Sequence, residues 1–362
     1  MSVNIHVVSA LTLGAFACAP FAVAQGSTGA LSKQETGYRP ERTSFGQPDL
    51  QGYWTNSSAT SVTRPPGLRD LEVDDDVAAA FVAKQPFVVA QNKQEEKFRT
   101  GELSGDSLPE SGNAKSASFA QEGYNTYWMD VATRLMKING NNRTSWIVEP
   151  ADGQLPFTAG GKTIVDEYNK MTGYNYAEGG NYSDPELLPA QERCIIGFTA
   201  KSGPLLMSGL YNGNYQIVQT PNHVVIQIEM IHDARIVPLN AIHGPAVLRP
   251  WFGDSTGWWD GDTLVVETRN VNPLHGLQGP IYLSKEGKVV ERFTRTSADA
   301  MLYEFEVTDP VFYSAPIRGE VAVRRGQRIY EYACHEGNYA MPNILGGSRI
   351  AEAQATSAKK PK

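Results

Sequence analysis

The sequence predicts a mainly β protein: an antiparallel up-and-down β-barrel with an N-terminal helical and loop insertion. From about residue 205 the chain consists of short runs in which apolar and polar residues alternate, as in half-buried strands. Short turn-rich connections without long helices separate these runs, so neighbouring strands should be antiparallel. A meander with this many strands tends to close on itself, although an immunoglobulin-like sandwich is the competing architecture.

The first strand is expected around Trp54, which lies far ahead of the others in the sequence. In the clearest later run, Val224, Ile226 and Ile228 lie on one face of the expected strand and Gln227 lies on the other. The remaining runs follow the same pattern. The expected later strands are 215–220, 223–231, 234–239, 263–268, 288–297, 301–307, 319–325 and 328–334. A barrel of about eight strands can fill its interior or hold one small ligand.

The insertion is expected at about residues 64–190, within a single barrel domain that spans 48–350. It should contain helices at 77–85, 88–98 and 160–172, because Asp74–Asp76 can cap the first helix and Pro86 follows it. Residues 102–120 lack periodicity and predict a loop or lid. We expect an extended lead-in at 25–47 and a disordered tail at 351–362.

Residues 7–24 form the only long apolar stretch and end in Ala22-Val23-Ala24, which resembles a signal-peptidase site. The sequence therefore predicts a signal peptide at 1–24, cleavage near Ala24 and a periplasmic or secreted protein. An uncleaved anchor is the alternative, but the stretch is short for a membrane span. No stable membrane span is expected after processing.

Removal of the signal peptide leaves two cysteines, Cys194 and Cys334. An even number of cysteines in an oxidising compartment predicts a disulfide, and two buried free thiols are the alternative.

The composition excludes several functions. A net charge of -7 argues against nucleic acid as a partner, because such proteins need a basic surface. The sequence contains no P-loop, no G-x-S-x-G and no H-E-x-x-H motif, and no histidine or cysteine spacing that favours a metal. We therefore expect no cofactor and no metal, and a small organic ligand or substrate as the partner. The oligomeric state is left open.

One polar cluster lies where two expected strands meet, at Glu229, His232, Asp233 and Arg235. Histidine beside carboxylates can act as a tuned acid or base, and arginine can stabilise an oxyanion. If the alternation continues through the corner, His232 points away from the other three side chains. A structural salt-bridge network is the alternative interpretation.

A second polar cluster follows the last expected strand. His335 and Glu336 are a candidate acid–base pair, and Asn338 and Tyr339 can orient a substrate; a capped turn is the alternative. Trp258 and Trp128 are candidates for a substrate-stacking wall, although core packing is the commoner role of such residues. We expect the two polar clusters to meet in a closed barrel.

Two resemblances extend this interpretation. Gly52-Tyr53-Trp54 resembles the first-strand signature of lipocalin-like (calycin) barrels. Strings such as PDLQGYW, EMIHDAR, GDTLVVET and YEYACHEGNY resemble an uncharacterised family of exported bacterial proteins, from about residue 48 to 347. The second resemblance implies export and supplies no reaction. The motif positions include all the candidates above except Trp258 and Cys334.

The function expected from these observations is an exported small-molecule enzyme that uses cofactor-free acid–base chemistry in a barrel cavity. A lyase, an isomerase or a hydrolase would fit. A periplasmic carrier for an apolar or aromatic ligand and a structural envelope protein are the alternatives. A polar interior favours the enzyme, whereas an apolar interior favours the carrier.

Overall fold

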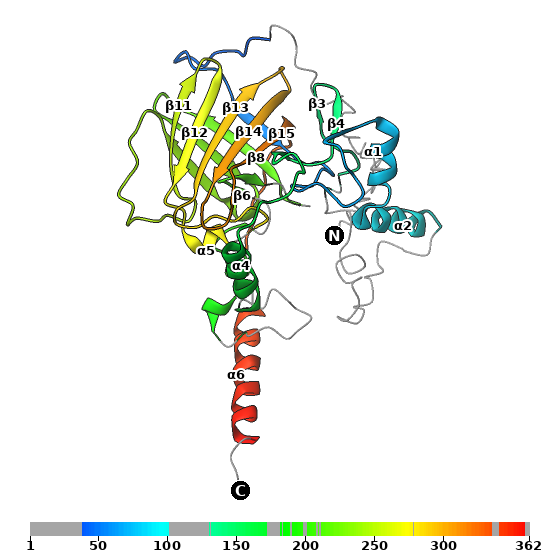
Figure 1. Ribbon diagram of the computed structural model, residues 1–362, viewed down its shortest axis with the longest axis vertical. Coiled ribbons are helices and arrows are strands. Elements are labelled where there is room, and N and C mark those ends of the chain that lie inside the picture. The colour runs from blue at the N-terminus through cyan, green and yellow to red at the C-terminus, as the bar shows by residue number, and fades with distance from the viewer. Residues whose placement is uncertain are drawn as a thin grey trace, which may run out of the picture. The chain divides into compact units, whose positions relative to one another are not determined.

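The protein is a nearly closed antiparallel β-barrel of nine strands, which confirms the predicted fold class (Figure 1). The computed structural model describes residues 38–100, 130, 132–171, 182, 184–188, 190–197, 201–207, 209, 211–277, 279–334 and 340–358. Around the barrel the strands are β10 (Ala234–Pro238), β9 (His223–Ile228), β8 (Asn214–Gln219), β1 (Gly52–Thr55), β15 (Ile317–Arg325), β14 (Ala300–Thr308), β13 (Lys288–Arg295), β12 (Thr263–Arg269) and β11 (Asp254–Asp260). A further strand, β5 (Ile147–Glu149), pairs with β15 outside this path.

The barrel closes between β10 and β11, and this closure is parallel. Because adjacent strands alternate in direction, the first and last of nine strands must run the same way. A parallel bridge joins Leu239 to Gly257, and the Asn240 N–H donates to the Gly257 carbonyl at 2.7 Å. A parallel pair needs a long crossover, which residues 239–253 supply.

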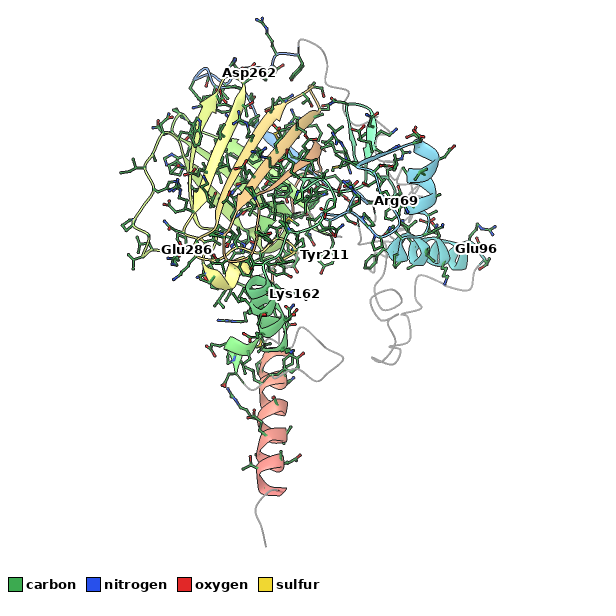
Figure 2. All side chains as sticks on the ribbon, in the orientation of Figure 1. Arg69, Glu96, Lys162, Tyr211, Asp262 and Glu286 are labelled. Atoms are coloured by element: carbon green, nitrogen blue, oxygen red, sulfur yellow. A yellow bond between two sulfur atoms is a disulfide. The ribbon has the colours of Figure 1, made fainter. Side chains whose placement is uncertain are left out.

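Inward-facing side chains fill the barrel (Figure 2). On β13 every second residue is buried, and β14 shows the same alternation from Met301 to Val307. Trp54 on β1 is fully buried, as are Phe293 on β13 and Tyr303 on β14. The interior also contains charged residues, which are described below.

The described residues of the insertion form a small sheet and three α-helices. The sheet consists of β2 (Glu72–Val73), β4 (Asn141–Arg143) and β3 (Lys137–Ile138). The helices are α1 (Asp75–Val82), α2 (Pro86–Thr100) and α4 (Ala159–Met171), close to the expected positions. A 3₁₀ turn, η3, follows at Pro185–Leu187. Pro86 begins α2, where its missing N–H costs no helical hydrogen bond.

Four further short elements accompany the barrel strands. The β6 (Lys201–Ser202) and β7 (Leu206–Met207) strands form a hairpin. A 3₁₀ turn, η4 (Met230–His232), separates β9 from β10, and α5 (Pro273–Gly276) lies at the lower end of the barrel in Figure 1.

Two expected elements differ from the structure. The expected strand at 328–334 is absent, because β15 already pairs with β14 and β1 and leaves no free edge. The expected disordered tail is helical as far as Ala358, in α6 (Ala340–Ala358), whose last turns are rich in alanine, the best helix former. The expected loop at 102–120 and the signal peptide lie outside the described residues. Within the described residues, no helix is both long and apolar enough to span a membrane.

Candidate functional site

The corner between β9 and β10 has an unusual backbone. Ile231 has φ 55° and His232 has φ 46°, so two consecutive non-glycine residues are left-handed. This conformation costs roughly 1–2 kcal/mol per residue, most for a β-branched side chain such as Ile231. Backbone strain of this kind is concentrated at functional sites, so the strained corner is a candidate functional site.

The turn separates the four polar residues of this corner. Glu229, Asp233 and Arg235 are buried, whereas His232 is exposed to solvent on η4. Glu229 accepts hydrogen bonds from the Asn214 side-chain amide at 3.1 Å and from the Tyr330 N–H at 3.2 Å. Its contacts therefore fasten the corner to the chain that follows β15.

Asp233 is 6% exposed and accepts a hydrogen bond from the Gly197 N–H at 2.9 Å. Burial raises the pKa of its carboxyl to about 7, although the Gly197 N–H and the charge of Lys201 act in the opposite direction. A carboxyl with a pKa near neutrality can both release and take up a proton at physiological pH.

Lys201, on β6, is 4% exposed. Burial lowers the pKa of its amine to about 8, partly offset by the charge of Asp233. An amine with this pKa is partly neutral at pH 7–8, as required of a proton acceptor or a nucleophile.

Arg235 forms a two-pronged ion pair with Glu291 inside the barrel. Its Nη1 and Nη2 lie 2.5 and 3.0 Å from the two carboxylate oxygens of Glu291, which is fully buried. The Tyr303 hydroxyl donates to Glu291 at 2.9 Å. Burial raises the pKa of Tyr215 and Tyr303 well above the usual range, so both phenols are neutral.

His275 approaches the same region from α5. It is 2% exposed, and its Nδ1 contacts the Trp251 carbonyl. A carbonyl only accepts, so Nδ1 carries the proton and Nε2 keeps its lone pair in the neutral ring. Burial, then the charge of Lys201, lowers the pKa of His275 to about 3, with Arg235 acting in the same direction. The ring is thus a hydrogen-bond acceptor at neutral pH.

These residues form one group, which we call the buried polar cluster: Lys201, Asp233, Arg235, His275 and Glu291. Gly203 lies against the guanidinium, since a β-carbon there would be 2.5 Å from Arg235 Cζ. The backbone next to Lys201 therefore packs directly on Arg235, which only a residue without a side chain permits.

Three buried polar atoms here have no hydrogen-bond partner among the described residues: Ser202 Oγ, Arg235 Nε and His275 Nε2. Buried polar groups in native proteins are almost always paired. Unpaired donors and acceptors gathered on neighbouring residues indicate a place for water or a small polar ligand.

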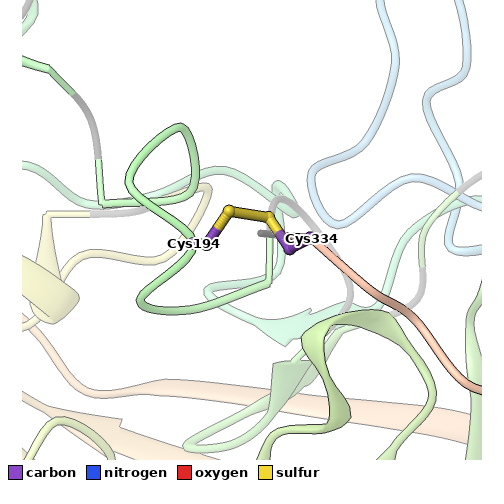
Figure 3. The surroundings of a disulfide bond; sticks show 2 residues. All are labelled: Cys194 and Cys334. Atoms are coloured by element: carbon purple, nitrogen blue, oxygen red, sulfur yellow. A yellow bond between two sulfur atoms is a disulfide. The ribbon is translucent and has the colours of Figure 1, made fainter. Parts of the chain in front are cut away.

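A disulfide joins Cys194 to Cys334, with Cα atoms 5.8 Å apart, which confirms the predicted bond (Figure 3). It fixes the chain after β15 to the 190–197 segment, whose Gly197 contacts Asp233. The described chain that ends at Cys334, just before the second predicted polar cluster, is therefore linked to a segment that contacts the first predicted cluster. His335, Glu336, Asn338 and Tyr339 themselves lie outside the described residues, as does Trp128.

Trp258 lies apart from the buried polar cluster. It is on β11 opposite Val265, and its side chain is 39% exposed. No group of three or more metal-binding side chains suited to a metal ion occurs in the part of the chain that the structure describes.

Lys201, His275 and Glu291 were not among the residues predicted from the sequence. A signal existed for Glu291, because it shares the apolar face of β13 with Val289 and Phe293, where a charge needs a partner. Lys201 and His275 lie in β6 and α5, elements of two and four residues that are too short to show periodicity, so nothing in the sequence distinguishes them.

Searches against models of known protein families and against curated proteins found no match to this chain. The resemblance to an exported bacterial family therefore stays a prediction.

Proposed function

We propose that the protein is an exported enzyme that transforms a small organic molecule by acid–base chemistry without an organic cofactor. The observation that carries this proposal is the buried polar cluster, in which an acid and an amine with opposite pKa shifts lie within reach of each other's charge. Lyase, isomerase and hydrolase reactions can all use such a pair for proton transfer.

In this proposal Asp233 and Lys201 carry the protons. Arg235 uses one N–H of each terminal nitrogen for Glu291, and its Nε has no partner among the described residues, so Nε is the donor we assign to a developing oxyanion. His275 Nε2 accepts a hydrogen bond from the substrate, since its tautomer is fixed by Trp251. His232, exposed on the strained turn, is a weaker candidate for the proton carrier than Asp233.

One observation favours this function over a carrier, and a second supports the exported location that the proposed function and its alternatives share. A carrier for an apolar ligand gains nothing from a charged interior, which is costly to bury. The disulfide supports export to a periplasmic or extracellular location, because such bonds persist in oxidising compartments. The predicted signal peptide supports the same location.

Isotope labelling tests the proposal without requiring that the substrate be identified first. The mature protein is incubated with a small-molecule extract of its host in D₂O or in H₂¹⁸O, and products are followed by mass spectrometry. Proton transfer at carbon incorporates deuterium, and hydrolysis incorporates ¹⁸O. We expect at least one labelled product, and a loss of at least about 100-fold in its rate of formation for Asp233→Asn and Lys201→Met.

Asp262→Asn and Lys285→Met serve as matched controls, because Lys285 is exposed and the side chain of Asp262 is 40% exposed. They should retain the wild-type rate. If no labelled product forms while an extract component binds unchanged, the protein is a carrier. If the product forms equally fast in both cluster variants, the chemistry takes place elsewhere.

A further inference from the structure

A cavity of about 340 Å³ lies outside the barrel, between residues 57–62, the start of α2 and β7. None of its described lining residues belongs to the buried polar cluster, although Met207 pairs with Lys201 between β7 and β6. The Met207 carbonyl accepts a hydrogen bond from the Tyr215 hydroxyl at 2.7 Å. Cavities of this size hold small molecules.

The walls of this cavity are mostly apolar. Phe87 and Val88 of α2 form one side, and Val62, Trp146 and Met207 form others. Trp146 is 3% exposed and Met207 is 6% exposed, so both are held in place by the core. Rigid apolar walls favour a ligand that is itself largely apolar.

The polar groups of the cavity define the ligand further. The Trp146 indole N–H and the Ser58 hydroxyl are buried and have no hydrogen-bond partner among the described residues. The indole N–H can only donate a hydrogen bond, and the hydroxyl can donate one as well as accept one. An oxygen acceptor on the ligand would therefore satisfy either group. Asp130 is the one charged residue among the described residues of the wall, which include no lysine, arginine or histidine.

We propose that this cavity binds a small, mainly apolar, uncharged molecule that carries an oxygen acceptor such as a ketone carbonyl. An anion finds no positive partner in the described wall and must lose its hydration, so the cavity discriminates against it. This site is separate from the buried polar cluster, and its occupancy does not depend on catalysis there.

Three fluorescent probes with one ring system test the proposal: 6-propionyl-2-dimethylaminonaphthalene, 2-dimethylaminonaphthalene and 6-dimethylaminonaphthalene-2-sulfonate. They differ only in carrying a ketone, a hydrogen or a sulfonate. Titration of the disulfide-intact protein should give the tightest binding for the ketone. The sulfonate should bind at least about tenfold more weakly than the ketone, and the unsubstituted ring should lie between them.

Cavity-filling variants locate the binding. Ala132→Phe and Val62→Phe each place a ring in the wall and should abolish binding of the ketone. Ala80→Phe, on the exposed face of α1, makes the same kind of change elsewhere and should leave binding intact. Thermal unfolding of each variant identifies any that is misfolded, and one folded filling variant suffices for the test.

Loss of ketone binding in a folded filling variant, together with weak sulfonate binding, supports the proposal. It is overturned if the ketone does not bind up to its solubility limit, or if the sulfonate binds as tightly. It is also overturned if ketone binding persists in both filling variants.

Discussion

At the scale of single residues, the main feature is the pair formed by Asp233 and Lys201. Burial moves the pKa of the acid up and that of the amine down, so both groups are poorly solvated in their charged forms. The pair therefore destabilises the fold most near pH 7–8, between the two shifted pKa values. A purely structural core would place apolar side chains at such positions.

The pH dependence of stability should reveal this cost. The stability that Asp233 contributes to the folded state is fully present below its unfolded pKa of 3.8 and is lost as the pH rises to about 7. The stability that Lys201 contributes to the folded state is fully present above its unfolded pKa of 10.5 and is lost as the pH falls to about 8. Relative to wild type, Asp233→Asn should therefore gain stability between pH 4 and 7, and Lys201→Met should gain it as pH falls from 10.5 to 8.

Urea unfolding from pH 4 to 10.5 measures these differences, with Asp262→Asn as the exposed control. Curves that run parallel for wild type and both variants would show that the two pKa values are not shifted.

Some of these residues could be predicted from the sequence and others could not. Asp233 and Arg235 stand beside a clearly alternating strand, so their polarity was conspicuous. Alternation also predicted that His232 points away from the other three side chains, but the left-handed turn at Ile231 that exposes it was not predictable, because no glycine or asparagine marks it. Lys201 is unusual only because the folded chain buries it, and the short sequence around it does not predict that burial.

At the scale of elements, the crossover at 239–253 is held by a histidine between two carboxylates. His243 Nδ1 lies 3.1 Å from Asp254 and its Nε2 lies 3.1 Å from Glu267. The Gly244 N–H donates to the same Asp254 oxygen at 2.7 Å. These contacts fasten the crossover to β11 and β12, although it exposes Ile242 almost completely.

Asp254→Ala should release this crossover. Because two contacts to one carboxylate disappear at a partly exposed site, we expect amide exchange at 240–250 to quicken at least about tenfold, while the global free energy of unfolding falls by about 1 kcal/mol. Hydrogen-exchange mass spectrometry and urea unfolding measure the two effects.

Asp262→Ala is the control. Asp262 pairs with Arg42 at the tip of the β11–β12 hairpin, where Figure 2 shows it, and its loss should not affect the crossover. Unchanged exchange at 240–250 in Asp254→Ala would mean that the crossover is held by other contacts.

Strands were predictable wherever alternation was regular, as on β9, β13 and β14. The residues 328–334 carry a similar composition but meet no free strand edge, and pairing partners are a property of the whole barrel. The parallel closure could not be foreseen either, because it depends on the total number of strands rather than on any one of them.

At the scale of the whole molecule, the disulfide links residues 140 positions apart and encloses β6 to β15. Replacing both Cys194 and Cys334 by serine should lower the free energy of unfolding by at most about 4–5 kcal/mol, because a loop of this length restricts the unfolded chain strongly. Urea unfolding measures the loss, and reduced wild-type protein should match the double variant. An unchanged midpoint would show that the bond does not stabilise the fold.

The same bond makes most of the barrel a covalent ring. A peptide bond cut anywhere between Cys194 and Cys334, for example by a protease at the exposed crossover, would leave a single covalently connected molecule. The two new chain ends would stay attached to strands that remain paired with their neighbours. The same nick in a chain without the bond would divide it into two separate polypeptides.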